Sequence, residues 1–123
     1  MTDRHLIISN NTELVRVAPE RIVYLEADGN YTTLILTDGE KRVLTFNLGT
    51  FQSLIEAQLG NEACWFVRIG KSLIINRNYI YVINVANQQL TMSDTGFREK
   101  YKLRASQEAL RELKKMLELT LKK

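Results

Sequence analysis

Short apolar stretches separated by turn residues dominate the first hundred positions, and this pattern is typical of β-strands. The expected strands cover residues 5–9, 13–17, 21–26, 31–37, 41–46, 65–69, 79–85, 90–92 and 101–104. Residues 73–76 are apolar, but the pattern alone assigns them no type. Because strands predominate and their connections are short, we expect a mainly β protein built from several small antiparallel sheets.

Three turn signals organise the expected strands. Asn10-Asn11 and Asp28-Gly29-Asn30 are residues that accept the backbone conformations of tight turns. Asp38-Gly39 is a dipeptide favoured in two-residue hairpin loops. We therefore predict a two-residue hairpin joining residues 31–37 to residues 41–46.

Two segments show helical spacing of apolar residues. After Asn47, a suitable N-cap, the apolar positions are Leu48, Phe51, Leu54, Ile55 and Leu59, and Gly60 ends the pattern. A C-terminal helix is expected after a second cap, Ser106, with Glu108 in its first turn, where the helix dipole favours negative charge. Its apolar stripe is Leu110, Leu113, Leu117 and Leu121, which we expect in the core together with Trp65 and Phe66.

Length and composition fit one globular domain spanning residues 1–123, with a core from about residue 6 to residue 117. No apolar stretch is long enough for a membrane span, and the N-terminus lacks an export-signal pattern, so a cytoplasmic protein without membrane contact is expected. The lone cysteine, Cys64, is expected to face the core. With His5 as the only histidine, no metal site, disulfide or nucleophilic dyad is available.

Other enzyme signatures are also missing. Gly70-Lys71-Ser72 resembles part of a phosphate-binding loop, but Trp65 stands where that motif requires its first glycine. Glu26 and Asp28 are better explained as solvated groups beside a turn than as a catalytic pair. We therefore expect neither an enzyme nor a cofactor.

Positive charge is concentrated near the C-terminus. Residues 98–123 carry nine Lys/Arg and four Glu, a balance of +5, whereas the first 97 residues carry eight basic and ten acidic groups, a balance of −2. A solvated helix face with a charged tail explains this distribution, and so does a surface for a polyanion. Composition alone does not separate the two.

Two blocks of the sequence form recognisable motifs. Residues 21–31 read RIVYLEADGNY, which contains the pattern I-x-Y-x-E-A-x-x-N-Y, and residues 66–76 read FVRIGKSLIIN. Both blocks resemble those of the LytTR-type DNA-binding domains of the LytR/AlgR family of bacterial response regulators. The order of hairpin, first block, D-G hairpin, short helix and second block also agrees. The resemblance extends from about residue 6 to residue 117.

The resemblance implies an elongated fold of small antiparallel sheets with short helices and a C-terminal helix. It also implies sequence-specific binding of double-stranded DNA, on paired direct repeats, by loops inserted into successive major grooves. Residues expected to read bases are Asn30, Tyr31, Lys71, Arg104 and Gln107. Residues expected to hold phosphates are Arg68, Ser72, Arg77 and Ser106.

Several alternatives stay open. Tyr31 could pack on a sheet, Arg68 could pair with a carboxylate such as Glu26, and Asn76 is expected to brace the backbone. The third loop departs from the family because Gln107 and Glu108, not basic residues, follow Ser106.

The receiver domain that commonly precedes such domains is not part of this sequence, so a separate signalling partner and a homodimer on DNA are further expectations. The rival function is a protein-interaction module on the same fold that has lost DNA binding.

Overall fold

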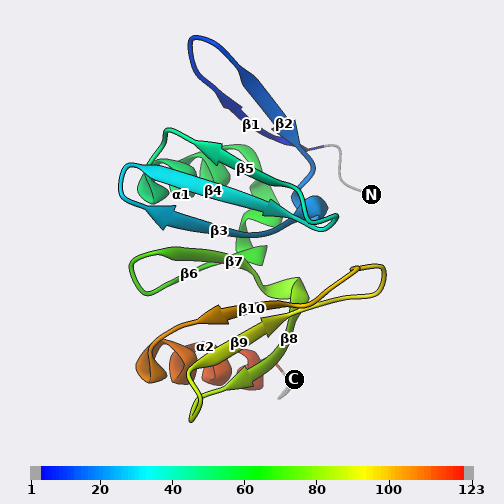
Figure 1. Ribbon diagram of the computed structural model, residues 1–123, viewed down its shortest axis with the longest axis vertical. Helices are drawn as coiled ribbons and strands as arrows, with labels where there is room; N and C mark the ends of the chain where they lie inside the picture. Colours follow the sequence, from blue (N-terminus) through cyan, green and yellow to red (C-terminus); the bar gives the residue numbers. More distant parts are fainter. Residues whose placement is uncertain (1–3, 121–123) are drawn as a thin grey trace.

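A computed structural model describes residues 4–120 as three antiparallel sheets and two helices stacked along the long axis of the molecule (Figure 1). The strands are β1 (Leu6–Ser9), β2 (Leu14–Val17), β3 (Ile22–Asp28), β4 (Tyr31–Leu36), β5 (Lys41–Leu44), β6 (Phe66–Ile69), β7 (Leu73–Asn76), β8 (Ile80–Asn84), β9 (Gln89–Met92) and β10 (Tyr101–Arg104). The helices are α1 (Leu48–Gln58) and α2 (Gln107–Leu119), with short 3-10 turns η1 (Pro19–Arg21), η2 (Gly60–Trp65) and η3 (Arg77–Tyr79). The expected mainly β, elongated fold is confirmed.

A five-stranded sheet in the order β5-β4-β3-β7-β6 forms the centre and is covered on both faces. Successive side chains of a strand point to opposite faces, and here both faces are buried. On β4, Leu34 packs into one hydrophobic cluster and Ile35 into the other, and Ile74 and Ile75 divide in the same way on β7. Burial on both faces explains why these strands are continuous apolar runs.

The first hydrophobic cluster joins one face of the central sheet to α1 and the β1–β2 hairpin. The Asn47 side chain caps α1 as expected, accepting a hydrogen bond from the Thr50 amide at 2.8 Å. The Gln58 amide group bonds both backbone groups of Ile7, at 2.7 and 3.0 Å, and so joins the end of α1 to β1. Phe51, fully buried, lies at the centre of this cluster.

The second cluster joins the opposite face of the central sheet to α2 and to a three-stranded sheet in the order β10-β9-β8. Two tyrosine hydroxyls donate hydrogen bonds between these layers. The Tyr101 hydroxyl bonds the Leu36 carbonyl at 3.1 Å, and the Tyr79 hydroxyl bonds the Glu20 carbonyl. The sheets are therefore held by directional contacts as well as by apolar burial.

Buried tyrosines make the fold sensitive to alkali. Burial, with smaller contributions from the charge of Glu26 and from neighbouring Tyr101, raises the pKa of Tyr24 to about 12. The unfolded chain loses this proton near pH 10, so the stabilisation is complete below pH 10 and is lost as the pH rises toward 12. We expect a decrease of about 2–3 kcal/mol in the free energy of unfolding between these limits, measured by urea denaturation. Y24F should show a smaller decrease, and an identical pH profile in both proteins would contradict this origin.

The loop between β4 and β5 differs from the expected two-residue hairpin. The Gly39 amide bonds the Leu36 carbonyl at 3.0 Å, and the Leu36 amide bonds the Glu40 carbonyl at 2.9 Å, so the loop has three residues. Gly39, at φ +90°, takes the left-handed position of such a loop. The Asp38-Gly39 dipeptide correctly marked a hairpin, but it fits the longer loop as well. β5 also ends at Leu44, before the expected residue 46.

Some residues that were expected in the core are exposed or only half-buried. Cys64 is exposed because it lies in η2, where its thiol contacts the Asn61 carbonyl at 3.1 Å. Phe66 is half-buried against the first cluster, and Trp65 is half-buried at the end of η2. In the C-terminal helix Leu110 and Leu113 are buried and Leu117 is half-buried, while Leu121 lies outside the described residues.

Candidate DNA-binding surface

The chain connections bring three loops to the same side of the molecule. We call them tip 1 (residues 28–31, between β3 and β4), tip 2 (residues 70–72, between β6 and β7) and tip 3 (residues 104–107, between β10 and α2). β3 runs into tip 1 and its antiparallel neighbour β7 leaves tip 2, so both tips lie at one end of the central sheet. β10 runs in the same direction as β3, and Figure 1 shows tip 3 on that side too.

Tip 1 is a tight hairpin turn with a single glycine in a left-handed conformation. Gly29 has φ +64°, and a Cβ atom there would meet no atom within 4 Å, so glycine is required by backbone conformation and not by space. Asn30 and Tyr31 are both exposed, and 52% of Tyr31 is accessible to solvent. Tyr31 is also the first residue of β4, and about half of its surface is covered, so its two interpretations stay open. The Asn30 and Tyr31 side chains are both accessible to solvent.

Hydrogen bonds connect tip 2 to tip 1, and the Arg68 side chain supports the tip 2 loop. The Ala27 amide, next to tip 1, donates to the Ser72 carbonyl at 2.8 Å. The Arg68 guanidinium donates to the Lys71 carbonyl and to the Gln52 side chain, both at 3.1 Å. Lys71 and Ser72 are exposed. The alternative in which Arg68 pairs with Glu26 is not observed; Arg68 supports the loop that carries Lys71.

Tip 3 is the transition from β10 to α2. The Ser106 hydroxyl oxygen caps α2 by accepting from the Ala109 amide at 3.1 Å, as expected for an N-cap. A hydroxyl that accepts in this way still has its own proton to donate, for example to a phosphate oxygen. Arg104 and Gln107 on either side are exposed. The Ala105 amide bonds the Gln88 carbonyl at 3.3 Å and fixes this connection to the β8–β9 turn.

Arg77 is the candidate that the structure does not bring to the tips. It begins η3 at the opposite end of β7, and its guanidinium lies 3.9 Å from the Cys64 sulfur. Asn76 next to it is fully buried; its side chain donates to the Ile22 carbonyl at 3.0 Å and accepts from the Asn78 amide. The expected bracing role of Asn76 is thus confirmed.

Two residues beside the tips, Lys102 and Gln52, were not among the individually predicted site residues. Lys102 is exposed on the same face of β10 as Arg104, because residues two apart on a strand share a face. Its alternation with buried Tyr101 and Leu103 could have revealed it. Gln52, which holds Arg68, carried no signal, because that contact joins a helix to a strand.

Two kinds of feature are absent from the described part of the chain. Within residues 4–120, no cluster of three His, Cys, Asp or Glu side chains is placed to hold a metal ion. No helix in the same range combines the length and apolar character needed to cross a bilayer.

A β framework that carries exposed Asn, Lys, Arg and Gln side chains on loops at one side is typical of a binding domain, because recognition groups are commonly placed on loops of a rigid scaffold. The family profile described as the LytTr DNA-binding domain matches residues 12–118. The chain therefore belongs to the LytTr family of DNA-binding domains.

A solved structure shares the fold. It is the LytTr DNA-binding domain of a protein described as a methyl-accepting/DNA response regulator from Bacillus cereus, with a TM-score of 0.62 and 20% sequence identity. The match covers 94% of this chain and 98% of that one. The search among curated proteins finds no match.

The brace at tip 2 gives a first prediction about binding. Replacing Arg68 with alanine frees the Lys71 loop, and we expect DNA affinity to decrease roughly fivefold, the loss typical of about 1 kcal/mol. Gln52→Ala removes the side chain that positions Arg68 but keeps the positive charge and the hydrogen bond to the Lys71 carbonyl. A decrease of about twofold in that variant therefore measures the effect of positioning Arg68 separately from the effect of its charge. Fluorescence anisotropy with a labelled duplex measures both, and an unchanged affinity in both variants would show that the brace is unimportant.

Proposed function

We propose that this domain binds double-stranded DNA sequence-specifically by inserting its loop tips into the major groove, and that this binding regulates transcription. The observation that carries the proposal is the location of all three tips on one side of a rigid sheet framework, with side chains exposed at each. Asn30 and Tyr31 at tip 1, Lys71 at tip 2, and Arg104 and Gln107 at tip 3 would contact base edges. The family assignment supports DNA as the partner.

Side-chain chemistry supports this assignment. Lysine and arginine donate to the O6 and N7 acceptors of guanine, and asparagine and glutamine pair with the edge of adenine. Ser72 and Ser106 have hydroxyl groups for phosphate oxygens, and Arg68 and Lys102 add positive charge beside the tips. In this proposal phosphate contacts fix the register and the tips read sequence.

Sheet geometry suggests how the tips divide along the duplex. The hairpins that carry tips 1 and 2 are adjacent in the central sheet, so their axes lie roughly 10 Å apart. The major groove is about 12 Å wide. We therefore place the first two tips on one stretch of duplex and tip 3, in the other layer, further along it. Paired direct repeats would then be occupied by two copies of the domain.

Selection from a pool of random duplexes tests the proposal directly. We expect enrichment of a defined motif, present as paired direct repeats in the tightest binders. A pool that shows no enrichment over a non-specific control would favour the second candidate, a protein-interaction module. Glu108 and Glu112, two exposed carboxylates on α2 next to tip 3, favour that second candidate because they would repel phosphates.

Salt dependence measures the phosphate contacts independently. If Arg68, Lys102 and further basic side chains of the C-terminal segment together neutralise about four phosphates, raising salt from about 50 to about 200 mM should weaken binding on the order of a hundredfold. Anisotropy titrations at several salt concentrations give the slope. A slope near zero would contradict a phosphate-based interface.

A further inference from the structure

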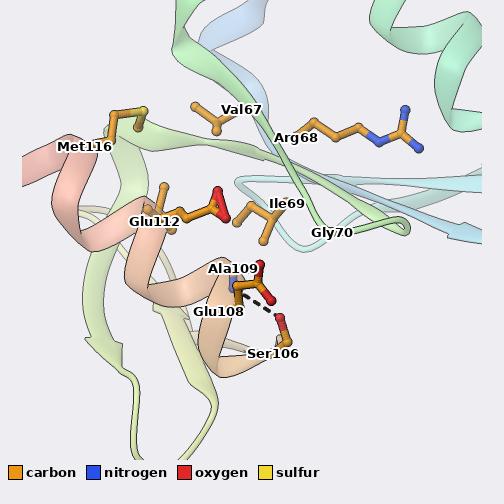
Figure 2. A pocket seen from close by; sticks show the side chains of 10 residues that line it. Val67, Arg68, Ile69, Gly70, Ser106, Glu108, Ala109, Glu112 and Met116 are labelled. Carbon is orange, nitrogen blue, oxygen red and sulfur yellow. Dashed lines mark hydrogen bonds between the residues drawn. The ribbon is translucent and has the colours of Figure 1, made fainter.

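A groove lies between β6 and α2, beside the tips and outside the proposed base-reading residues. Its volume is about 470 Å³, and it is lined by Val67, Arg68, Ile69, Gly70, Ser106, Glu108, Ala109, Glu112, Leu113 and Met116 (Figure 2). We propose that this groove is a docking site for an extended, basic and apolar peptide segment of a partner protein. The segment would add as a strand to the free edge of β6.

The first argument is the edge strand. β6 ends the five-stranded sheet and pairs only with β7 in the described part of the chain. Four consecutive residues of β6 and its turn line the groove, although alternate residues of a strand point to opposite faces. The groove is therefore bordered by the backbone edge of β6. Such an edge presents unpaired amide and carbonyl groups, which an extended peptide can satisfy by strand addition.

The second argument is the apolar lining of the groove. Ile69 and Leu113 are 5% and 4% exposed, and the half-buried side chains of Val67, Ala109 and Met116 surround them. The α2 positions recur every three to four residues and so form one helix face. Methionine adapts to differently shaped side chains. This surface fits the apolar side chains on one face of an added strand.

The third argument is charge. Glu108 and Glu112, one helical turn apart, are exposed along the α2 wall, and neither carboxylate has an ion-pair partner among residues 4–120. Figure 2 shows both side chains on the groove side of α2, whereas the Arg68 side chain extends away toward its partner Gln52. The groove is thus acidic although this end of the chain is basic overall. The complementary occupant has lysine or arginine among its apolar residues.

This docking does not depend on DNA, so it can be tested without DNA and can fail separately from the proposed function. The probe is a short capped peptide of alternating lysine and valine, titrated into the isotopically labelled protein and followed by amide NMR. We expect saturable binding, with shifts confined to residues 66–70 and 106–116. The β6 amides that do not bond β7 should become protected from hydrogen exchange.

Matched variants assign the binding to the groove. E108Q/E112Q should weaken binding about fivefold, the effect expected for two exposed ion pairs. E20Q/E56Q makes the same charge change at exposed positions outside the groove and should leave binding unchanged. Equal weakening by both pairs, an equal affinity for a peptide of alternating glutamate and valine, or binding without protection of β6 would each overturn the proposal.

Discussion

A variant in which Asn30, Lys71 and Arg104 are all replaced by alanine is expected to lose specific DNA binding. One exposed side chain is removed from each tip, and each base contact contributes about 1–3 kcal/mol of discrimination. The three positions lie on separate loops, so their losses should be nearly additive and exceed a hundredfold in affinity. Lys71→Ala alone should relax the preference at one base position. Anisotropy with the selected duplex and with mismatched duplexes measures both effects.

The control variant removes the same three residue types at the opposite end of the strands, away from the tips. It replaces Asn61, Lys41 and Arg77 with alanine; Lys41 begins β5 and Arg77 follows β7, both away from the tips. We expect less than a threefold change, mainly from the lost charge. If the control loses as much affinity as the tip variant, binding does not depend on the tips, and Arg77 returns as a phosphate contact.

Phe51→Ala should cause the largest loss of stability. Phe51 is fully buried between α1 and the central sheet, and its ring meets that of Phe46 edge to face, with centroids 6.0 Å apart. Removing a buried phenylalanine side chain costs about 3–5 kcal/mol through lost burial and the remaining cavity. Urea denaturation measures this loss, and a change below about 1 kcal/mol would contradict the central position of Phe51.

An exposed residue of the central sheet provides the control for the stability effect of Phe51→Ala. Val43 on β5 is 59% exposed, and Val43→Ala should change stability by less than about 0.5 kcal/mol. Phe51→Ala should also weaken DNA binding at temperatures where the protein is still folded. The reason is that α1 carries Gln52, which holds Arg68 and through it the Lys71 loop.

The sequence predicted the elements well wherever local chemistry decides them. Asn47 and Ser106 act as N-caps through their own side chains, so both helix starts were correct. The type of residues 73–76 was undecided because a short apolar run fits several environments. That segment is a strand because β3 and β6 flank it and both of its faces are buried.

Long-range contacts explain what the sequence could not show. Arg68 contacts a side chain on α1 and the carbonyl of Lys71, and neither contact follows from strand periodicity. Cys64 was expected to be buried because Trp65 and Phe66 follow it, but a 3-10 turn there rotates it to the surface. The location of the tips on one side required the antiparallel pairing of β3 with β7, which connects segments almost fifty residues apart.

The most direct test is an amide NMR titration of the domain with its selected duplex. The account predicts that the largest shifts fall at residues 28–31, 70–72 and 102–107, while residues 38–41, 61–65 and 77–79 at the other end of the sheets change little. Shifts concentrated at that other end, or spread evenly over the surface, would contradict the claim that the three tips form the DNA-binding side.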